Sequence, residues 1–343
     1  MEGFPQQVSL SYLYRKVFSS HESTVSFLQQ MGTFPSHKKC PKCEVPMKLV
    51  IASGAQKHGI GRFRCQRIAK HADKKEVSIQ LAAGTWLERA KLTPQDAILL
   101  MYFFGLELTN DQIKHEFSGF RDNGTTLSDE TISDYRSLFR DSLKQREEKV
   151  EREEGPLGGE NVCVQLDESK FGRRKHNRGR LVDGPWMLGM IDEPPVDADK
   201  NAFYGMRIEI CPDNKRDSAT LIPLIQKHVQ VGTTITTDQW GAYNELENLG
   251  YSHLRVNHSE NYVDPETGAH TQRIESCWRP LKYFLIRHSS RHEHLPHLIK
   301  EFLWRRRMRY RGDTDHFSSI ISAVNDKFAD TELSLPERFP EDL

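Results

Sequence analysis

Thr233-Thr234-Ile235-Thr236-Thr237-Asp238 is the stretch that decides the fold class. Its first five residues are all β-branched, which is typical of a buried strand, and an acid follows directly. A second stretch, Asn161-Val162-Cys163-Val164-Gln165-Leu166-Asp167, also predicts a strand that ends at an acid. Because functional groups gather at the carboxyl ends of strands in an α/β sheet, we expect Asp167 and Asp238 to converge.

Further elements are predicted around these two strands. The apolar patterns indicate strands over 186–191, 202–210 and 253–257, and helices over 218–229, 242–249 and 271–287. Three consecutive strands are thus followed by helix, strand, helix, strand and helix, which is typical of a mixed α/β sheet flanked by helices. We assign this domain to residues 160–311.

The chain before this domain divides into three predicted segments. Residues 1–35 form a lead-in with short helices at 10–18 and 22–31, and residues 36–85 carry Cys and His among short strands. Residues 86–155 predict helices at 95–104, 108–117 and 128–153. They resemble a DNA-contacting helix-turn-helix, with a plain three-helix packing element as the alternative. The turn-rich residues 154–159 mark the boundary with the following domain.

The formal net charge of the 343 residues is zero, but the charge is unevenly distributed. Ser36 to Val77 hold eleven Lys and Arg against three Asp and Glu, and Arg273 to Arg311 hold the same numbers. Residues 312–343, an acidic C-terminal tail, hold two basic against eight acidic residues. Basic blocks of this kind can bind phosphates although the average is neutral, or they can be solvated faces.

Composition excludes several classes of protein. No run of about 18 apolar residues is present, so we expect no membrane span. No secretory signal is visible at the start, so the six cysteines do not predict a disulfide framework. We expect a reducing compartment, the nucleus if the source is eukaryotic and the cytoplasm if it is bacterial.

Three acidic residues lie at positions that are typical of a metal-binding site. Asp167 and Asp238 follow strands, and Glu275 lies in the first turns of the last predicted helix. Attack on a phosphodiester needs an activated nucleophile and a stabilised leaving oxygen, which two magnesium ions about 3.5–4 Å apart can supply. Magnesium prefers such oxygen ligands, although each acid alone is also a common turn or cap residue.

A second metal site is predicted near the N-terminus. Cys40 and Cys43 form a CxxC knuckle, and Cys65 follows after a strand-like gap. Zinc is bound by four nitrogen or sulfur ligands in a tetrahedron. His71 is our preferred fourth ligand and His58 the weaker candidate, while three unliganded thiols in a degenerate ribbon remain the alternative.

The segments around the acids carry a family resemblance. They are Val164-Gln165-Leu166-Asp167-Glu168-Ser169-Lys170-Phe171-Gly172, Thr236-Thr237-Asp238-Gln239-Trp240-Gly241-Ala242-Tyr243, Val256-Asn257-His258-Ser259, His270-Thr271-Gln272-Arg273-Ile274-Glu275-Ser276-Cys277-Trp278 and Leu281-Lys282. This series resembles the catalytic core of the Merlin superfamily of DNA transposases and of bacterial insertion-sequence relatives with the same DDE domain. The resemblance covers residues 36–310 and is strongest over 160–290.

The resemblance implies an RNase H-like, retroviral-integrase-like core with Asp167, Asp238 and Glu275 as the catalytic triad. It also implies dependence on two magnesium or manganese ions, and a structural zinc in the N-terminal ribbon. The relatives usually have a second close cysteine pair in that ribbon, where this chain has Gln66 and Arg67. The implied activity is cleavage at terminal inverted repeats and joining of the 3′-hydroxyl to target DNA, a cut-and-paste reaction. Pairing two DNA ends calls for a homodimer or higher oligomer.

Several basic residues are candidates for DNA contacts. One group lies in a hairpin-like stretch between the first two core strands and the other on the Glu275 helix; they are Arg173, Arg174, Lys175, Arg180, Arg273, Arg279 and Lys282. For the hairpin, a solvated loop is the alternative. Trp278 is either a core anchor or a stacking surface for an unpaired base. Glu168 should point away from Asp167, so it is left out of the metal set.

Three other functions fit parts of the pattern. The chain can be a host-adopted, transposase-derived DNA-binding protein that does not cut DNA, an RNase H-like nuclease or resolvase, or a structural zinc-ribbon adaptor. The complete acid series favours an enzyme, and the ribbon and helix-turn-helix favour sequence-specific DNA recognition. Joining of 3′ ends into target DNA distinguishes the transposase from these alternatives.

Overall fold

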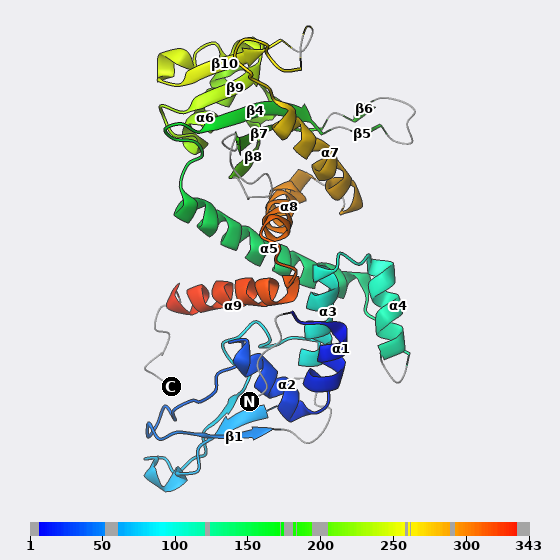
Figure 1. Ribbon diagram of the computed structural model, residues 1–343. Helices are drawn as coiled ribbons and strands as arrows, with labels where there is room; N and C mark the ends of the chain where they lie inside the picture. The colour runs from blue at the N-terminus through cyan, green and yellow to red at the C-terminus, as the bar shows by residue number, and fades with distance from the viewer. Residues whose placement is uncertain are drawn as a thin grey trace. The chain divides into compact units, whose positions relative to one another are not determined.

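The computed structural model describes residues 7–51, 61–120, 124–171, 173–174, 181–182, 184–193, 205–257, 260, 262–288 and 292–334 (Figure 1). The chain forms two compact units. Unit 1 comprises Met1–Gln145 and Asp313–Leu343, and unit 2 comprises Arg146–Gly312. Within the described ranges, no helix is both long and apolar enough to cross a membrane.

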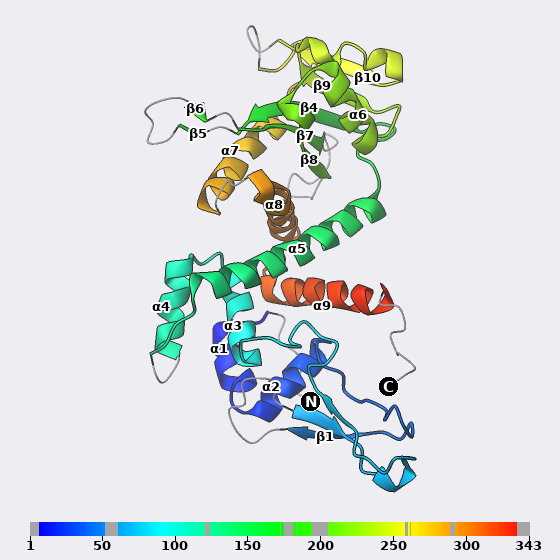
Figure 2. The same cartoon turned by 180° about the vertical axis from the view of Figure 1, so that it is seen from behind.

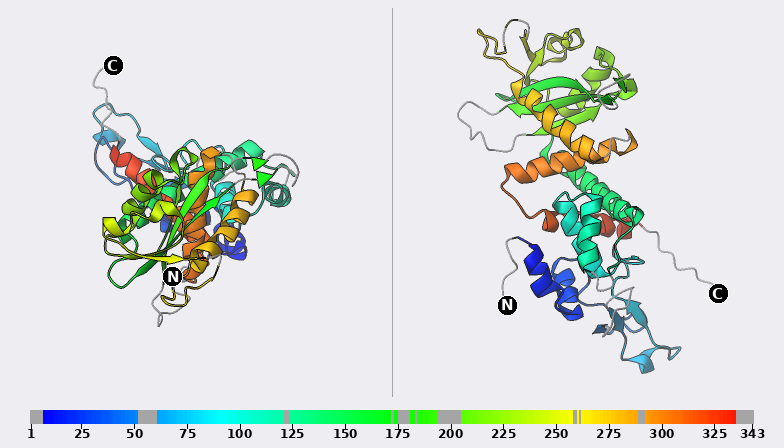
Figure 3. Two further views of the ribbon diagram at one scale, coloured as in Figure 1. Left: turned by 90° about the horizontal axis from the view of Figure 1, so that it is seen from above. Right: turned by 90° about the vertical axis from the view of Figure 1, so that its right-hand side faces the viewer.

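Unit 2 is built on a five-stranded mixed sheet with the order β10-β9-β4-β7-β8, which Figure 3 shows from two further directions. The strands are β4 Cys163–Lys170, β7 Trp186–Glu193, β8 Met206–Ile210, β9 Thr234–Asp238 and β10 Ser252–Val256. β7 is antiparallel to both β4 and β8, whereas β9 is parallel to both β4 and β10. The predicted mixed α/β sheet is therefore confirmed.

The predicted end of the first core strand at Asp167 is wrong, because β4 continues to Lys170. Pairing with β9 covers only Cys163 to Gln165, but antiparallel pairing with β7 continues to Lys170 opposite Trp186. Asp167 therefore lies just past the parallel pairing, within a strand that β7 still supports. Asp238 is the last residue of β9, as predicted.

Helices cover both faces of the sheet. The helix α6, Ser218–His228, packs on one face through Leu221, Ile222 and Ile225 (Figure 2). The helices α7, Gln272–Arg287, and α8, Leu295–Tyr310, pack on the other face. Unit 2 also contains the short strands β5, Arg173–Arg174, and β6, Leu181–Val182, and the 3-10 turns η4, Pro212–Asn214, and η7, His292–His294.

The helix predicted over 242–249 is replaced by two 3-10 turns, η5 Gly241–Tyr243 and η6 Glu247–Leu249. Tyr243 and Leu246 are both buried in the core against α6. A segment this short is marginal as an independent α-helix, and a spacing of three residues suits 3-10 geometry. Gly250 then ends the segment in the left-handed conformation, with φ 88°.

The N-terminal part of unit 1 contains short helices and a small sheet. The helices are α1 Leu10–Tyr12, the π-helical turn η1 Leu13–Val17, α2 His21–Gln30 and the 3-10 turn η2 Ile68–Lys70. Strands β1 Lys48–Ile51, β2 Gly61–Arg64 and β3 Ser78–Gln80 form an antiparallel sheet in that order. The short strands predicted in the Cys/His segment are confirmed.

Three helices follow, as predicted: α3 Pro94–Gly105, α4 Asn110–Phe120 and α5 Asp129–Glu154. Thr93 caps α3, because its hydroxyl accepts a hydrogen bond from the Asp96 amide at 3.1 Å. Most of α3 is buried, as its apolar sequence indicates. α5 begins in unit 1, and its residues from Arg146 onward belong to unit 2.

The acidic C-terminal segment contains the helix α9, His316–Ser334, which belongs to unit 1. Its Phe317, Ile320, Ile321 and Val324 are buried. Asn325 accepts hydrogen bonds from Thr33 and Trp86 and donates one to the carbonyl of Met31. The segment predicted as an acidic tail therefore supplies part of the core of unit 1.

Candidate active site and metal centre

The four predicted zinc ligands of unit 1 lie together. Their ligand atoms, from Cys40, Cys43, Cys65 and His71, are all within 4.8 Å of one another. The Cys43 and Cys65 sulfurs are 3.7 Å apart, and His71 Nε2 is 3.3 Å from Cys40 Sγ and 3.4 Å from Cys65 Sγ. Sulfurs at roughly 2.3 Å from a tetrahedral zinc are about 3.8 Å apart, so this Cys3His cluster can bind zinc.

Local structure prepares these ligands. His71 Nδ1 lies 2.6 Å from the carbonyl oxygen of Lys75, an arrangement that leaves Nε2 to face the sulfurs. Burial opposes ionisation of Cys40, but hydrogen bonds from the backbone amides of Lys42 and Cys43 and from the side chains of Cys43 and Cys65 together lower the pKa of this thiol to about 7. His58, the weaker candidate, lies outside the described residues.

The three acids of unit 2 come from β4, β9 and α7. Asp167 Oδ2 accepts a hydrogen bond from the Trp278 indole at 2.6 Å. Asp238 Oδ1 accepts one from the Trp240 amide at 2.9 Å, and Glu275 Oε1 accepts one from the Thr271 hydroxyl at 2.7 Å. Each carboxylate therefore has one oxygen held by a hydrogen-bond donor.

The acids interact electrostatically. Burial, with the charges of Glu275 and Asp238 adding to it, raises the pKa of Asp167 to about 6, against the hydrogen bond from Trp278. Like charges at one place disfavour ionisation, and a cation placed among them would reverse this effect. In the described part of the chain, the Cys3His cluster is the only group of three or more His, Cys, Asp or Glu side chains whose ligand atoms all lie within 4.8 Å of one another. The carboxylate oxygens of the three acids are therefore farther apart than the ligand atoms of that cluster.

Gln165 fixes the start of α7 relative to β4. Its side chain is fully buried, and its Oε1 accepts hydrogen bonds from the amides of Arg273 and Ile274 at 3.0 and 3.2 Å. Thr271 occupies the cap position, but it makes no capping hydrogen bond and its hydroxyl binds Glu275 instead. The side chain of Gln165 in the neighbouring strand thus binds the first amides of α7 in place of a cap by Thr271, and it sets the position of Glu275 relative to Asp167.

Trp278 is a core anchor, which was one of the two expected roles, and it also has a role that neither expectation contained. It is 6% exposed and packs in the core between α7 and the sheet, while its indole N–H holds Asp167. Gly189 of β7 lies directly opposite Asp167, and a Cβ at Gly189 would come within 2.6 Å of the Trp278 ring. The missing side chain at Gly189 therefore makes room for Trp278 beside the acid.

Sequence reasoning missed a second group of side chains near Asp238. Glu168 is nearly fully buried; it accepts a hydrogen bond from the Tyr243 hydroxyl and lies 3.9 Å from Arg216. Burial, with Asp238 and Asp167 adding to it, raises the pKa of Glu168 to about 7, against the hydrogen bond from Tyr243. The Arg216 guanidinium lies 4.5 Å from the ring of Trp186 and 4.1 Å from that of Trp240. The adjacent acid pair Asp167-Glu168 was the available signal.

The residues predicted to contact DNA differ in their exposure to solvent. Arg279 and Lys282 are exposed on α7. Arg273 is half-buried, and its positive charge contributes a lowering effect to the pKa values of Asp192 and Arg306. Arg173 and Arg174 lie in β5, as the hairpin expectation requires. Lys175 and Arg180 lie outside the described residues.

Comparison with known proteins identifies the class. The ISXO2-like transposase domain matches residues 145–307, which include all three acids and nearly all of unit 2. An uncharacterised transposase-like protein of Haemophilus influenzae is 32% identical over 89 residues, which are 26% of this chain and 71% of that protein. These matches define a transposase of the insertion-sequence type.

The chain belongs to a family of insertion-sequence-type transposases, which implies that it binds DNA. The insertion-sequence part of the resemblance is thus supported. Membership of the Merlin superfamily stays a prediction.

Proposed function

We propose that unit 2 is the RNase H-like catalytic domain of a cut-and-paste transposase, with Asp167, Asp238 and Glu275 as its metal-binding acids. One observation carries this proposal. The three acids come from different elements of a mixed sheet, and they lie close enough for Glu275 and Asp238 to raise the pKa of Asp167.

The residues present fit magnesium. Carboxylates are the hard oxygen ligands that this ion prefers, and mutual repulsion among acids is relieved by a cation. When bound, two magnesium ions activate the attacking oxygen and stabilise the leaving oxygen of a phosphodiester. Trp278, Trp240 and Thr271 hold one oxygen of each acid and so orient the remaining carboxylate oxygens.

Two displacements make up the proposed reaction. In the first, a water oxygen bonds to phosphorus at the transposon end, the bond from phosphorus to the 3′ oxygen breaks, and a 3′-hydroxyl is released. In the second, this hydroxyl bonds to a target phosphorus and displaces a target 3′ oxygen, which takes up a proton. The basic side chains Arg279 and Lys282, exposed on the Glu275 helix, hold the DNA backbone beside the acids.

Unit 1 is the proposed recognition part. The Cys3His cluster holds zinc and orders the lysine- and arginine-rich segment around it, and α3 to α5 provide a helix-turn-helix. Phosphate contacts position the protein, and helix side chains read the terminal repeats. Two DNA ends must be paired, so we propose at least a dimer.

Joining of DNA ends in the presence of magnesium tests the proposal. The full chain is incubated with a plasmid that carries the DNA flanking its gene, and new joints between flanking ends and a target plasmid are counted by sequencing. We expect Asp167→Asn, Asp238→Asn and Glu275→Gln each to abolish joining without weakening DNA binding. Glu245→Gln, an exposed acid of the same unit, is the matched control.

Two outcomes would overturn the proposal. Binding without joining by the unaltered protein would favour the host-adopted DNA-binding protein. Joining that survives in the three acid variants would exclude these residues as the catalytic set.

A further inference from the structure

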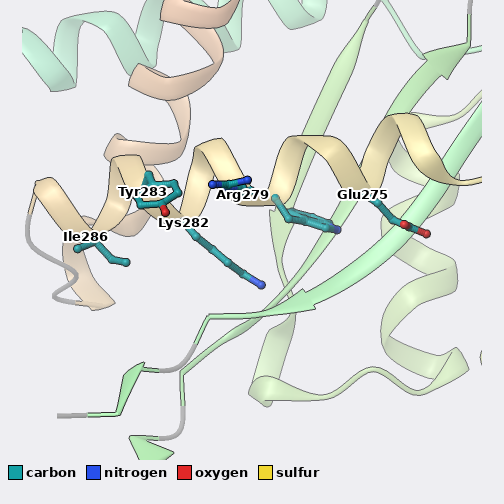
Figure 4. A pocket seen from close by; sticks show the side chains of 6 residues that line it. Glu275, Arg279, Lys282, Tyr283 and Ile286 are labelled. Carbon is teal, nitrogen blue, oxygen red and sulfur yellow. The ribbon is translucent and has the colours of Figure 1, made fainter. Parts of the chain in front are cut away.

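The exposed face of α7 carries apolar side chains that the proposed chemistry does not use. Tyr283 is 58% exposed and Ile286 is 50% exposed, although both are large and apolar enough to be buried. They follow Glu275 by eight and eleven residues, so all three lie on one face of the helix. Figure 4 shows Glu275, Arg279, Lys282, Tyr283 and Ile286 projecting from successive turns of α7.

These side chains line a surface hollow of about 370 Å³; its lining residues are Glu275, Trp278, Arg279, Lys282, Tyr283 and Ile286. Small-molecule pockets occupy roughly 300–1,000 Å³, so the hollow suits one nucleotide and is too small for a duplex. Glu275 at one end makes the hollow continuous with the acid site.

Cations accompany the apolar groups. The Arg279 guanidinium lies 5.7 Å from the centre of the Tyr283 ring, and Lys282 Nζ lies 5.3 Å from the centre of the Phe171 ring. Both cations are exposed, so they remain available to phosphate oxygens. Cationic side chains beside an exposed aromatic ring are the combination that binds single-stranded nucleic acid.

We propose that this hollow holds one unpaired nucleotide of the DNA strand whose scissile phosphate lies at Glu275. Its base stacks on Tyr283 and packs against Ile286, and its phosphate contacts Arg279 and Lys282. The inference rests on the proposed function, since it takes Glu275 as the end of the DNA path. A base must leave the duplex stack to offer its face to Tyr283, so the DNA near the cut is opened here.

The distance along α7 from Glu275 to Ile286 limits where the unpaired nucleotide lies. Eleven residues of α-helix span about 16 Å, and stacked nucleotides rise about 3.4 Å per step along one strand. The nucleotide is therefore within about five positions of the scissile phosphate. Trp278 is not its stacking partner, because it is buried and bound to Asp167.

Binding of partly single-stranded DNA tests the inference. The full chain is titrated, in buffer without added magnesium or manganese, into a fluorescein-labelled blunt duplex and into the same duplex with a 3′ extension of about five nucleotides. Anisotropy gives both affinities. A second extended duplex carries 2-aminopurine in the extension, and its fluorescence reports stacking.

We expect the unaltered protein to bind the extended duplex more tightly and to quench the 2-aminopurine. Tyr283→Ala should weaken binding of the extended duplex about fivefold or more, with little effect on the blunt one, and should abolish the quench. Tyr283→Phe keeps the ring and should behave as the unaltered protein does. Tyr262→Ala removes an aromatic side chain that is 73% exposed and does not line the hollow, so it is the matched control.

An unchanged preference for the extension in Tyr283→Ala would overturn the inference. So would an equal loss on both duplexes, or an equal loss in Tyr262→Ala. The joining assay decides the proposed function separately, because Tyr283 can fail this test while the acid variants still abolish joining. Conversely, the binding preference can hold in a protein that joins no DNA.

Discussion

At the scale of single residues, Asp167 is the side chain on which the acid site depends. The negative charges of Asp238 and Glu275 raise the pKa of Asp167, and the hydrogen bond from Trp278 lowers it in part. The three acids could be proposed from the sequence, because each stands at the end of an apolar strand pattern or in the first turns of a helical pattern. The roles of Gln165 and Trp278 were not, because their partners lie 105 to 111 residues away in sequence. The local sequence offered one signal of the role of Gln165, because a glutamine between two buried apolar residues of a strand needs hydrogen-bond partners.

The shifted pKa of Asp167 predicts a pH dependence of stability. The folded pKa is about 6 and the ordinary value is 3.8, so the folded protein retains a proton that the unfolded chain releases between these values. The free energy of unfolding therefore falls as pH rises from about 4 to 6, and the loss persists at higher pH. Asp167→Asn removes this loss and keeps an acceptor for Trp278.

We expect Asp167→Asn, without divalent metal, to be more stable than the unaltered protein by on the order of 2 kcal/mol near pH 8, and equally stable near pH 4. Urea unfolding across this range measures the difference, with Glu245→Gln as the control. A difference that does not change with pH would contradict the electrostatic explanation.

His71 gives the second residue-scale prediction. We expect one zinc ion per chain in the purified unaltered protein. Because His71 completes the Cys3His cluster, His71→Ala should lower this zinc content and destabilise unit 1. Elemental analysis and release of zinc to a chromogenic chelator measure this. His37, which is on the same segment and outside the cluster, supplies the control His37→Ala. Full zinc content in His71→Ala would exclude it as a ligand.

At the scale of elements, the strands and helices of the sheet followed from periodicity, because burial on one or both faces leaves a clear pattern. The two errors have tertiary causes. β4 is longer than its apolar run because β7 keeps pairing with it, and 242–249 forms 3-10 turns because Tyr243 and Leu246 are anchored in the core. Neither partner is visible in the local sequence.

The anchoring of α7 by β4 gives the element-scale prediction. Gln165→Ala removes the acceptor of two helix-end amides, so we expect the free energy of unfolding to fall by about 1–3 kcal/mol. Glu275 should also lose its position relative to Asp167, so manganese affinity should fall. Chemical denaturation and calorimetry measure the two effects, with the exposed Gln226→Ala of α6 as the control. Unchanged manganese affinity would show that the anchor does not position Glu275.

At the scale of the whole molecule, the chain order does not match the compact units. Unit 1 combines residues from both ends of the chain, and α9 fills its core. The sequence marked residues 312–343 only by their acidic charge, because the apolar stripe of α9 is short and its partners Met31, Thr33 and Trp86 lie more than 230 residues away in the sequence.

α9 gives the prediction at this scale. Ile320→Ala should destabilise unit 1 by about 2–5 kcal/mol, since Ile320 is fully buried. Truncation after Gly312 should have a larger effect, whereas truncation after Ser334 keeps α9 and serves as the control. Limited proteolysis and thermal unfolding report the difference. Equal resistance of the two truncated proteins would contradict the assignment of α9 to unit 1.

The measurement that tests the central claim most directly is anomalous diffraction from crystals of the full chain grown with manganese. We predict ions bound by Asp167, Asp238 and Glu275, about 3.5–4 Å apart if two are present. We also predict that the carboxylate of Asp167 turns toward the ions, which changes its contact with Trp278. Manganese at other sites only, with the three acids as they are here, would contradict the claim that they form the metal site.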